Sequence, residues 1–403
     1  MTAIHERPRR GRRGAEKTAA KRRHPASRIA PDGRGPLKPV GRRTPVFLFI
    51  LLVVMALVAL GVVMVLSASA AASLSDAGSA WSLFRRQLLW TAVGTVAMLV
   101  TLRIDYHRLR PLARPGLIVS FVLLALVVFP GVGVTVNGAT RWLGAGGLTL
   151  QPSEPAKLAL ILFVADLLSR RSRRISDARS TVRPVVCVGC AMAFLLMLQP
   201  HLGATLIVGT VVVAMLFLAG APVAPLTGMA GLGGAFAGLL VLSSSWRRDR
   251  LLAFLDPWSD PAGVGYQPLQ SLHAITVGGL SGVGLGASRA KWGFLPYAHT
   301  DFIFAIVAEE LGLLGASLVV LGFVALAAAG YTTALRARDR FGMLLAAGIT
   351  TWILAQAVLN MGAVMALLPV TGVTLPFLSF GGSSQVVTMA AVGVLLNVAR
   401  QVR

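Results

Sequence analysis

Long apolar stretches alternate with short polar or basic connections along most of the chain. A helix needs about twenty mostly apolar residues to cross the hydrocarbon core of a bilayer. Stretches near that length recur ten times, at 46–68, 88–104, 117–134, 154–169, 184–199, 203–221, 225–245, 302–330, 342–366 and 384–400. The pattern predicts an all-α polytopic membrane protein with about ten transmembrane helices. A long extracytoplasmic loop, about 246–301, is expected between helices seven and eight.

The first 45 residues have a different pattern, with no apolar run and 14 Lys or Arg against three acids. Runs of like charge spaced by Pro and Gly are typical of disordered segments. Attraction to anionic membrane lipid explains such a tail better than nucleic-acid binding does. We therefore expect a disordered basic cytoplasmic tail at 1–45, no nucleic-acid partner, and a ten-helix domain at 46–403.

Composition supports the membrane interpretation and excludes a water-soluble enzyme. Of the 403 residues, 55% are hydrophobic and only 13% are charged, and the mean hydropathy is +0.74. A soluble domain has about 25% charged residues, which cover its surface. This chain has too few charged groups to cover the surface of a soluble protein of its length.

Basic residues are distributed unevenly between the two predicted faces. If the tail is cytoplasmic and the helices alternate, 29 of the 38 Lys and Arg fall on the cytoplasmic side. This is the positive-inside pattern, so both termini are expected in the cytoplasm. The other nine lie at or near the outer face: Arg85, Arg86, Arg141, Lys157, Arg247, Arg248, Arg250, Arg289 and Lys291. They favour an anionic substrate displayed outside, although a long loop can also be translocated regardless of its charge.

Four outer segments have irregular backbone rich in Pro and Gly: 137–157, 199–203, 246–301 and 368–384. Such backbone at membrane depth is tolerated only where it is buried in protein or lines a cavity. The four segments therefore predict one outward-facing cavity. The sequence contains no metal-ligand cluster, phosphate-binding P-loop or Ser/His/Asp set, so no cofactor is identified, and a divalent cation stays open.

Asp301 stands where the long loop meets the next apolar stretch. Partial burial there would raise its pKa and suit it to proton abstraction, whereas Thr300-Asp301 could equally be an ordinary helix N-cap. Glu309 and Glu310 follow at membrane depth, where carboxylates are functional or pair with a neighbouring helix.

The loop before the fourth predicted helix carries further candidates. Arg141 suits phosphate recognition, and Trp142 suits an interfacial anchor or the wall of a lipid or sugar site. Glu154 and Lys157 stand three residues apart and can share one helix face, which favours an internal ion pair.

Four motifs, in order, resemble the SEDS family of bacterial peptidoglycan glycosyltransferases over most of 46–403. They are Asn137-Gly-x-x-Arg141-Trp142 with Gln151-Pro-Ser-Glu154-x-x-Lys157; Gln199-Pro-x-Leu-Gly203; His299-Thr-Asp301-Phe-Ile-Phe304 with Glu309-Glu310-Leu-Gly312; and Pro376-x-x-Ser379-x-Gly-Gly-Ser-Ser384. The resemblance implies a ten-helix enzyme that polymerises lipid II, an undecaprenyl-pyrophosphate-linked disaccharide peptide, on the outer face of the cytoplasmic membrane. It also implies a class B penicillin-binding protein as the cross-linking partner.

The resemblance implies that Asp301 is catalytic. The expected substrate-binding residues are Arg141, Trp142, Glu154, Lys157, Arg247, Arg250, Lys291, His299 and Ser379. The expected supporting residues are Glu309, Glu310, Gln199 and His201. The chain departs from the family at His201 and Tyr297, where acids are usual. Titration of His201 near neutral pH would make the activity pH-dependent.

Two branches of the family remain as alternatives. Phe254–Trp258, Gly265–Leu272 and Ser288–Pro296 resemble the division branch, while Val370–Gly382 resembles the elongation branch that maintains cell shape. We expect septal synthesis during division, with other division or elongation proteins as partners. A lipid II flippase or transporter is the alternative from another class, because ten helices and an outer cavity also suit one; a non-catalytic division scaffold is a third.

Overall fold

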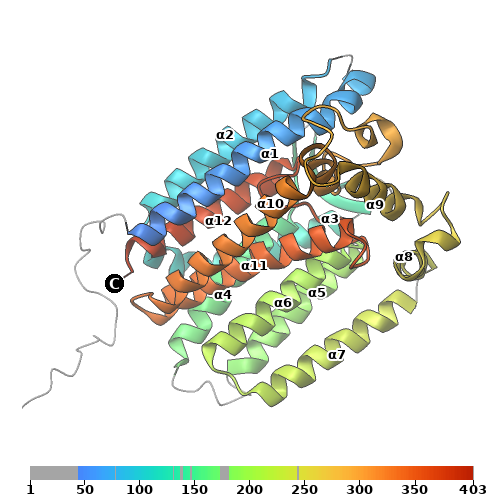
Figure 1. The fold of residues 1–403 in the computed structure, drawn as a ribbon. Coiled ribbons are helices and arrows are strands. Elements are labelled where there is room, and N and C mark those ends of the chain that lie inside the picture. The colour runs from blue at the N-terminus through green and yellow to red at the C-terminus, as the bar shows by residue number, and fades with distance from the viewer. Residues whose placement is uncertain are drawn as a thin grey trace, which may run out of the picture. The chain divides into compact units, whose positions relative to one another are not determined.

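The structure is a computed structural model that describes residues 44–402 apart from 78, 130, 137–138, 146–147, 173–180 and 243–244. Most of the predicted tail at 1–45 therefore lies outside the described residues. In the described part of the chain, ten helices overlap the ten predicted stretches (Figure 1): α1 (Pro45–Ala77), α2 (Ser82–Arg103), α3 (Ala113–Val128), α4 (Ser153–Arg170), α5 (Arg183–Leu198), α6 (Leu202–Ala219), α7 (Val223–Leu242), α10 (Ile303–Leu335), α11 (Arg340–Val364) and α12 (Gly382–Arg400).

Six candidate membrane spans are found among the described residues. They lie in α1, in the segment Tyr106–Val128, and in α6, α10, α11 and α12. Helix α5 has only 16 residues, fewer than the about twenty that a bilayer requires, and α4 carries Glu154, Lys157 and Asp166. The chain is thus a mostly helical, multi-pass membrane protein, and the count of ten spans stays a prediction.

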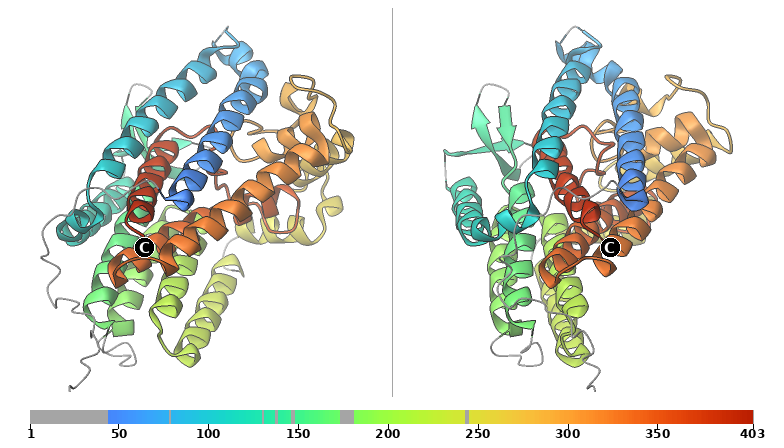
Figure 2. Two further views of the ribbon diagram at one scale, coloured as in Figure 1. Left: turned by 60° about the vertical axis from the view of Figure 1, so that its left-hand side comes forward. Right: turned by 90° about the vertical axis from the view of Figure 1, so that its left-hand side faces the viewer.

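Helices α11 and α12 form the centre of the bundle. In each of them, 72% of the most apolar window is buried, against 28–33% for α1, α10 and the α3 segment. Helix α2 packs along α12, as both views of Figure 2 show. A Cβ at Gly393 would lie 2.3 Å from the Met98 oxygen, so glycine is required for this close approach. Leu52, Leu89 and Ile118 remain exposed on the outside of the bundle, as expected for side chains that face lipid.

The all-α prediction was wrong for the loop between α3 and α4. Strands β1 (Gly133–Val136), β2 (Ala139–Ala145) and β3 (Leu148–Leu150) form an antiparallel sheet in the order β1-β2-β3. The segments are short, but Val, Thr and Trp favour strands, and pairing satisfies backbone groups that an irregular loop would leave open. The sheet places Arg141 and Trp142 on its central strand.

The predicted long loop is also ordered into short helices. It contains α8 (Ser245–Leu255), the turn η4 (Pro257–Ser259), α9 (Tyr266–Gly278) and the irregular turn η5 (Ala290–Phe294). Its glycine-rich stretch runs against a kink in α10 at Gly312, where φ is +66°. The main-chain amide of Val283 donates to the main-chain oxygen of Glu309 at 3.0 Å. These glycines therefore allow two backbones to touch, and the contact fixes the loop against α10.

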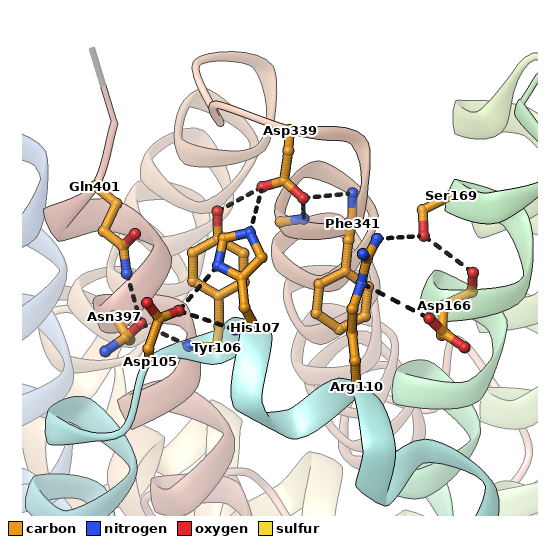
Figure 3. A network of polar contacts seen from close by, with 11 residues as sticks. Asp105, Tyr106, His107, Arg110, Asp166, Ser169, Asp339, Phe341, Asn397 and Gln401 are labelled. Carbon is orange, nitrogen blue, oxygen red and sulfur yellow. Dashed lines mark hydrogen bonds and ion pairs between the residues drawn. The ribbon is translucent and has the colours of Figure 1, made fainter. Parts of the chain in front are cut away.

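A polar clasp, shown in Figure 3, joins four elements at the end of the bundle that lies at the far end of α10 from Asp301. The clasp consists of Asp105, Tyr106, His107, Arg110, Asp166, Ser169, Asp339, Asn397 and Gln401. The Tyr106 hydroxyl donates to Asp339, and His107 contacts Asp105 at 2.9 Å and Asp339 at 3.6 Å. η1 (Tyr106–Leu112), the end of α4, the start of α11 and the end of α12 therefore meet at one end of the bundle.

Asp339 is expected to be the residue on which the clasp depends most. It caps α11 through the amides of Phe341 and Gly342. Asp339→Ala should lower the free energy of unfolding by about 1–3 kcal/mol, because the cap and the Tyr106 bond are lost together. Asp339→Asn should lose less, since its amide oxygen can still cap. Thermal unfolding of the detergent-solubilised protein measures the difference, and equal losses would contradict the capping role.

The same residue should make stability depend on acid. Burial would raise the pKa of Asp339, but hydrogen bonds from His107 and Tyr106 outweigh that effect and lower the pKa below its ordinary value. A carboxyl with a depressed folded-state pKa stabilises the protein above its unfolded pKa, and this contribution is lost as pH falls through the folded pKa. Stability measured between about pH 5 and pH 3 should therefore fall more steeply for the wild type than for Asp339→Asn.

Candidate active site

Asp301 lies in the turn that precedes α10. Helix α10 begins at Ile303 with Phe302 as its N-cap, and no side chain caps it. The Thr300 hydroxyl instead donates to the main-chain oxygen of Tyr297 at 3.2 Å, so the N-cap interpretation of Thr300-Asp301 was wrong. Among the described residues, none donates a hydrogen bond to the half-buried Asp301 carboxylate. The carboxylate is therefore available to accept a proton from a ligand.

Two guanidinium groups act on this carboxylate. Burial raises the pKa of Asp301 to about 6, and the charges of Arg141 and Arg250 oppose the rise. Gly372 lies between the groups: a Cβ there would be 3.5 Å from Arg141 Nη1 and 3.8 Å from Asp301 Oδ2. A carboxylate with a pKa near neutrality is suited to act as a general base, and the guanidinium groups can stabilise an anion beside it.

Arg141 is oriented by the connection between α5 and α6. Its Nε donates to the Gln199 oxygen at 3.3 Å, and its Nη2 donates to the Pro200 oxygen. The side-chain amide of Gln199 in turn donates to the main-chain oxygen of Leu124 at 2.9 Å, which ties the connection to α3. Gln199 therefore supports Arg141 from behind rather than facing Asp301.

His201 lies in the same connection and is only 3% exposed. Burial lowers its pKa well below the ordinary value, and the charges of Arg141 and Lys157 add to the effect. Its Nε2 lies 3.0 Å from Gln151 Nε2. This lowered pKa contradicts the expectation that His201 titrates near neutral pH, because burial and the charges of Arg141 and Lys157 disfavour the charged imidazole.

The connection between α11 and α12 holds Asp301 in place. The side-chain amide of Asn360 donates to the main-chain oxygens of Asp301 and Val373, both at 2.7 Å. Ser379 Oγ donates to the main-chain oxygen of Thr300 at 2.6 Å and accepts from the main-chain amide of Leu375 at 2.8 Å. Both side chains thus fasten the turn that carries Asp301 to the loop that carries Gly372.

Glu154 and Lys157 form the predicted ion pair, with 2.8 Å between Oε1 and Nζ. Both are buried, and Lys157 Nζ also donates to Gln356 Oε1 at 2.8 Å. Gln356 Nε2 donates to the main-chain oxygen of Thr374 at 3.1 Å. The pair therefore supports the α11–α12 connection from within the bundle, and the charges that act on Asp301 are those of Arg141 and Arg250.

Lys291 and the two acids of α10 form a separate group. Lys291 Nζ lies 3.1 Å from Glu310 Oε1 and donates to Ser67 at 3.0 Å. Glu309 accepts from the Ser288 hydroxyl and from the Arg289 amide. These contacts join η5 to α10 and α1, so the acids at membrane depth pair with neighbouring elements.

The remaining candidates surround the site less closely. The His299 ring packs edge-on against Phe380 with 5.9 Å between the ring centroids. Trp142 is half-buried on β2 and pairs with Val134. The side chain of Arg247 lies outside the described residues, as does Asn137.

Sequence reasoning missed Gln356 and Asn360. Neither is charged, and both lie inside the apolar helix α11, so neither stands out as an ionisable group does. Their spacing of four places both amides on one face of α11. Two buried amides on one face of a membrane helix indicate polar partners across the interface, and this signal was present in the sequence.

We expect Asn360→Leu to lower catalytic activity by a larger factor than its loss of thermal stability alone explains. The change leaves the Asp301 and Val373 oxygens without their donor, which costs about 1–3 kcal/mol, and it releases the turn that positions Asp301. Asn397→Leu is the matched control, since Asn397 donates to the Leu102 oxygen and accepts from the Tyr106 amide far from Asp301. Both variants should lose similar thermal stability, but only Asn360→Leu should lower kcat by about tenfold or more.

These features define a multi-pass membrane protein with a half-buried carboxylate, on which two guanidinium charges act, at one end of its bundle. The family model of FtsW, RodA and SpoVE, described as cell cycle proteins, matches residues 47–403. The chain therefore belongs to the FtsW/RodA/SpoVE family.

Individual relatives agree with this assignment. The stage V sporulation protein E of Bacillus subtilis is 43% identical, over 90% of this chain and 99% of that protein. A probable peptidoglycan glycosyltransferase FtsW of Geobacter metallireducens is 42% identical, over 88% and 95%. A chain from a solved peptidoglycan synthase complex that coordinates polymerization and crosslinking is 32% identical, with a TM-score of 0.70 over 87% of this chain and 96% of that one.

Proposed function

We propose that this chain is a peptidoglycan glycosyltransferase of the FtsW type, which polymerises lipid II at the outer face of the cytoplasmic membrane during septal synthesis. The observation that carries the proposal is the Asp301 carboxylate, with its pKa raised to about 6 beside Arg141 and Arg250. The similarity to proteins named FtsW, over most of the chain, supports the same function.

The reaction is an inverting glycosyl transfer. Asp301 takes the proton from the 4-hydroxyl of the acceptor sugar, and that oxygen forms a bond to the anomeric carbon of the growing donor chain. The bond from this carbon to the pyrophosphate oxygen breaks, and undecaprenyl pyrophosphate leaves with the bonding electrons. Arg141 and Arg250 stabilise the charge that accumulates on the leaving group, which lowers the barrier.

The membrane arrangement is ten spans with both termini in the cytoplasm. η1, the end of α4, the start of α11 and the end of α12, which the alternation of spans puts on the cytoplasmic side, meet at the polar clasp, and Asp301 lies at the other end of α10, which supports this orientation. In this orientation the basic residues near the clasp lie on the cytoplasmic side, as the positive-inside rule predicts.

A class B penicillin-binding protein is the proposed partner, supplying the cross-links. The similarity to a chain from a complex that coordinates polymerization and crosslinking supports this pairing. The division role places the pair at the septum.

The test is polymerisation of labelled lipid II by the purified full chain together with its partner. Glycan ladders support the proposal, whereas movement of lipid II across liposomes without polymer would favour a flippase. Neither polymer nor movement would favour the non-catalytic scaffold. The position of a fluorescent fusion separates the two cellular roles, because a sidewall pattern would favour the RodA-like elongation alternative over septal synthesis.

A further inference from the structure

A pocket with a volume of about 270 Å³ opens beside Arg250. It lies between α8, the start of α9 and the α11–α12 connection, and its wall includes Arg250, Phe254, Tyr266 and Gln267. Asp301 does not line it. The pocket is therefore a separate space next to the carboxylate, and neither the motifs nor the reaction above assign it a ligand.

Two polar groups in the wall are available to a ligand. Within the described residues, neither the Tyr266 hydroxyl nor the side-chain amide of Gln267 forms a hydrogen bond. Both side chains are half-buried, so water reaches them only partly. A binding pocket combines apolar and aromatic walls with a few polar groups that fix a ligand's orientation, and this wall has that composition.

Arg250 connects the pocket to the catalytic carboxylate. It lines the pocket, and its charge acts on Asp301. Its Nη1 donates to the Val370 oxygen at 3.3 Å, and Val370 also lines the pocket two residues before Gly372. A ligand in the pocket would therefore have its anionic end at Arg250 and its reacting carbon on the side of Asp301.

We propose that this pocket holds the donor's sugar ring, the one joined directly to the pyrophosphate. The proposal rests on the proposed glycosyl transfer and names the subsite within it. The volume lies just below the lower limit of about 300 Å³ for drug-sized ligands, which suits one hexosamine ring rather than a disaccharide peptide. Phe254 and the Tyr266 ring face its apolar side, the Tyr266 hydroxyl and the Gln267 side-chain amide bond its polar substituents, and Arg250 holds the pyrophosphate.

The experiment compares two ligands that differ in the sugar. Binding of fluorescent lipid II, and its displacement by undecaprenyl pyrophosphate, are measured on full-length Asp301→Asn protein, which prevents turnover. Gln267→Met and Tyr266→Phe are added singly, with Gln270→Met as the matched control on the same helix. Each pocket variant should bind lipid II about tenfold more weakly, the effect of one hydrogen bond. The inhibition constant of undecaprenyl pyrophosphate, which carries no sugar, should stay unchanged.

The outcomes are distinct. Unchanged lipid II affinity in both pocket variants, or an equal loss for both ligands, would overturn the sugar assignment. The undecaprenyl pyrophosphate measurement also shows that each variant is folded. Failure of the proposed function is recognised separately, because wild-type protein would then make no glycan ladder, whatever the pocket variants bind.

Discussion

Asp301→Asn is expected to reduce glycan polymerisation at least about 100-fold and up to about 10,000-fold, the range for loss of a general acid or base. The amide keeps the shape of the carboxylate but cannot take the acceptor proton. Asp256→Asn is the matched control, since the Asp256 carboxylate lies between α8 and α9, where it caps η4. Ladder formation by purified protein measures both. A variant at Asp301 that polymerises at the wild-type rate would remove the proposed base.

Two further readouts separate loss of the base from loss of the fold. Because burial raises the pKa of Asp301 to about 6, its ionised form is disfavoured in the folded protein, and the neutral amide should unfold at the same temperature or higher. In the wild type, kcat should fall about tenfold per pH unit below pH 6, as the base becomes protonated. Any residual activity of Asp301→Asn should lack that dependence.

The hydrophobic pattern predicted the helices well because each stretch is long and is bounded by basic or irregular segments. The sheet at 133–150 was missed because its strands are short and their residues also suit an irregular loop. Hydropathy cannot distinguish the two, since the pairing depends on turns and on backbone groups that need partners.

The candidate active site could be predicted from the sequence only in part, for a different reason. The position of Asp301 before an apolar stretch indicated a desolvated carboxylate, but its neighbours come from distant segments, and only the fold brings Arg141 and Arg250 to it. The sequence also did not indicate that Lys291 forms an ion pair with Glu310, so its predicted contact with substrate stays a prediction. Spacing within one helix predicted the pair of Glu154 and Lys157, but pairs between distant segments, such as Lys291 with Glu310, depend on the fold.

Breaking the buried pair of Glu154 and Lys157 should have the largest effect on stability. Lys157→Met leaves the Glu154 carboxylate in a site where it is 4% exposed, and removing one partner of a buried pair costs about 3–5 kcal/mol. The loss should also reach the active site, because Gln356 binds both Lys157 and the Thr374 oxygen. Thermal unfolding in detergent and kcat for lipid II should therefore both decline.

The double variant Glu154→Gln with Lys157→Met distinguishes an ion pair from simple packing. With both charges removed, no uncompensated charge is buried, and a neutral replacement of similar volume is often tolerated. The double variant should therefore unfold at a higher temperature than either single variant. If the two single losses simply added, the pair would contribute nothing as a pair, and the α11–α12 connection would depend on Gln356, Asn360 and Ser379.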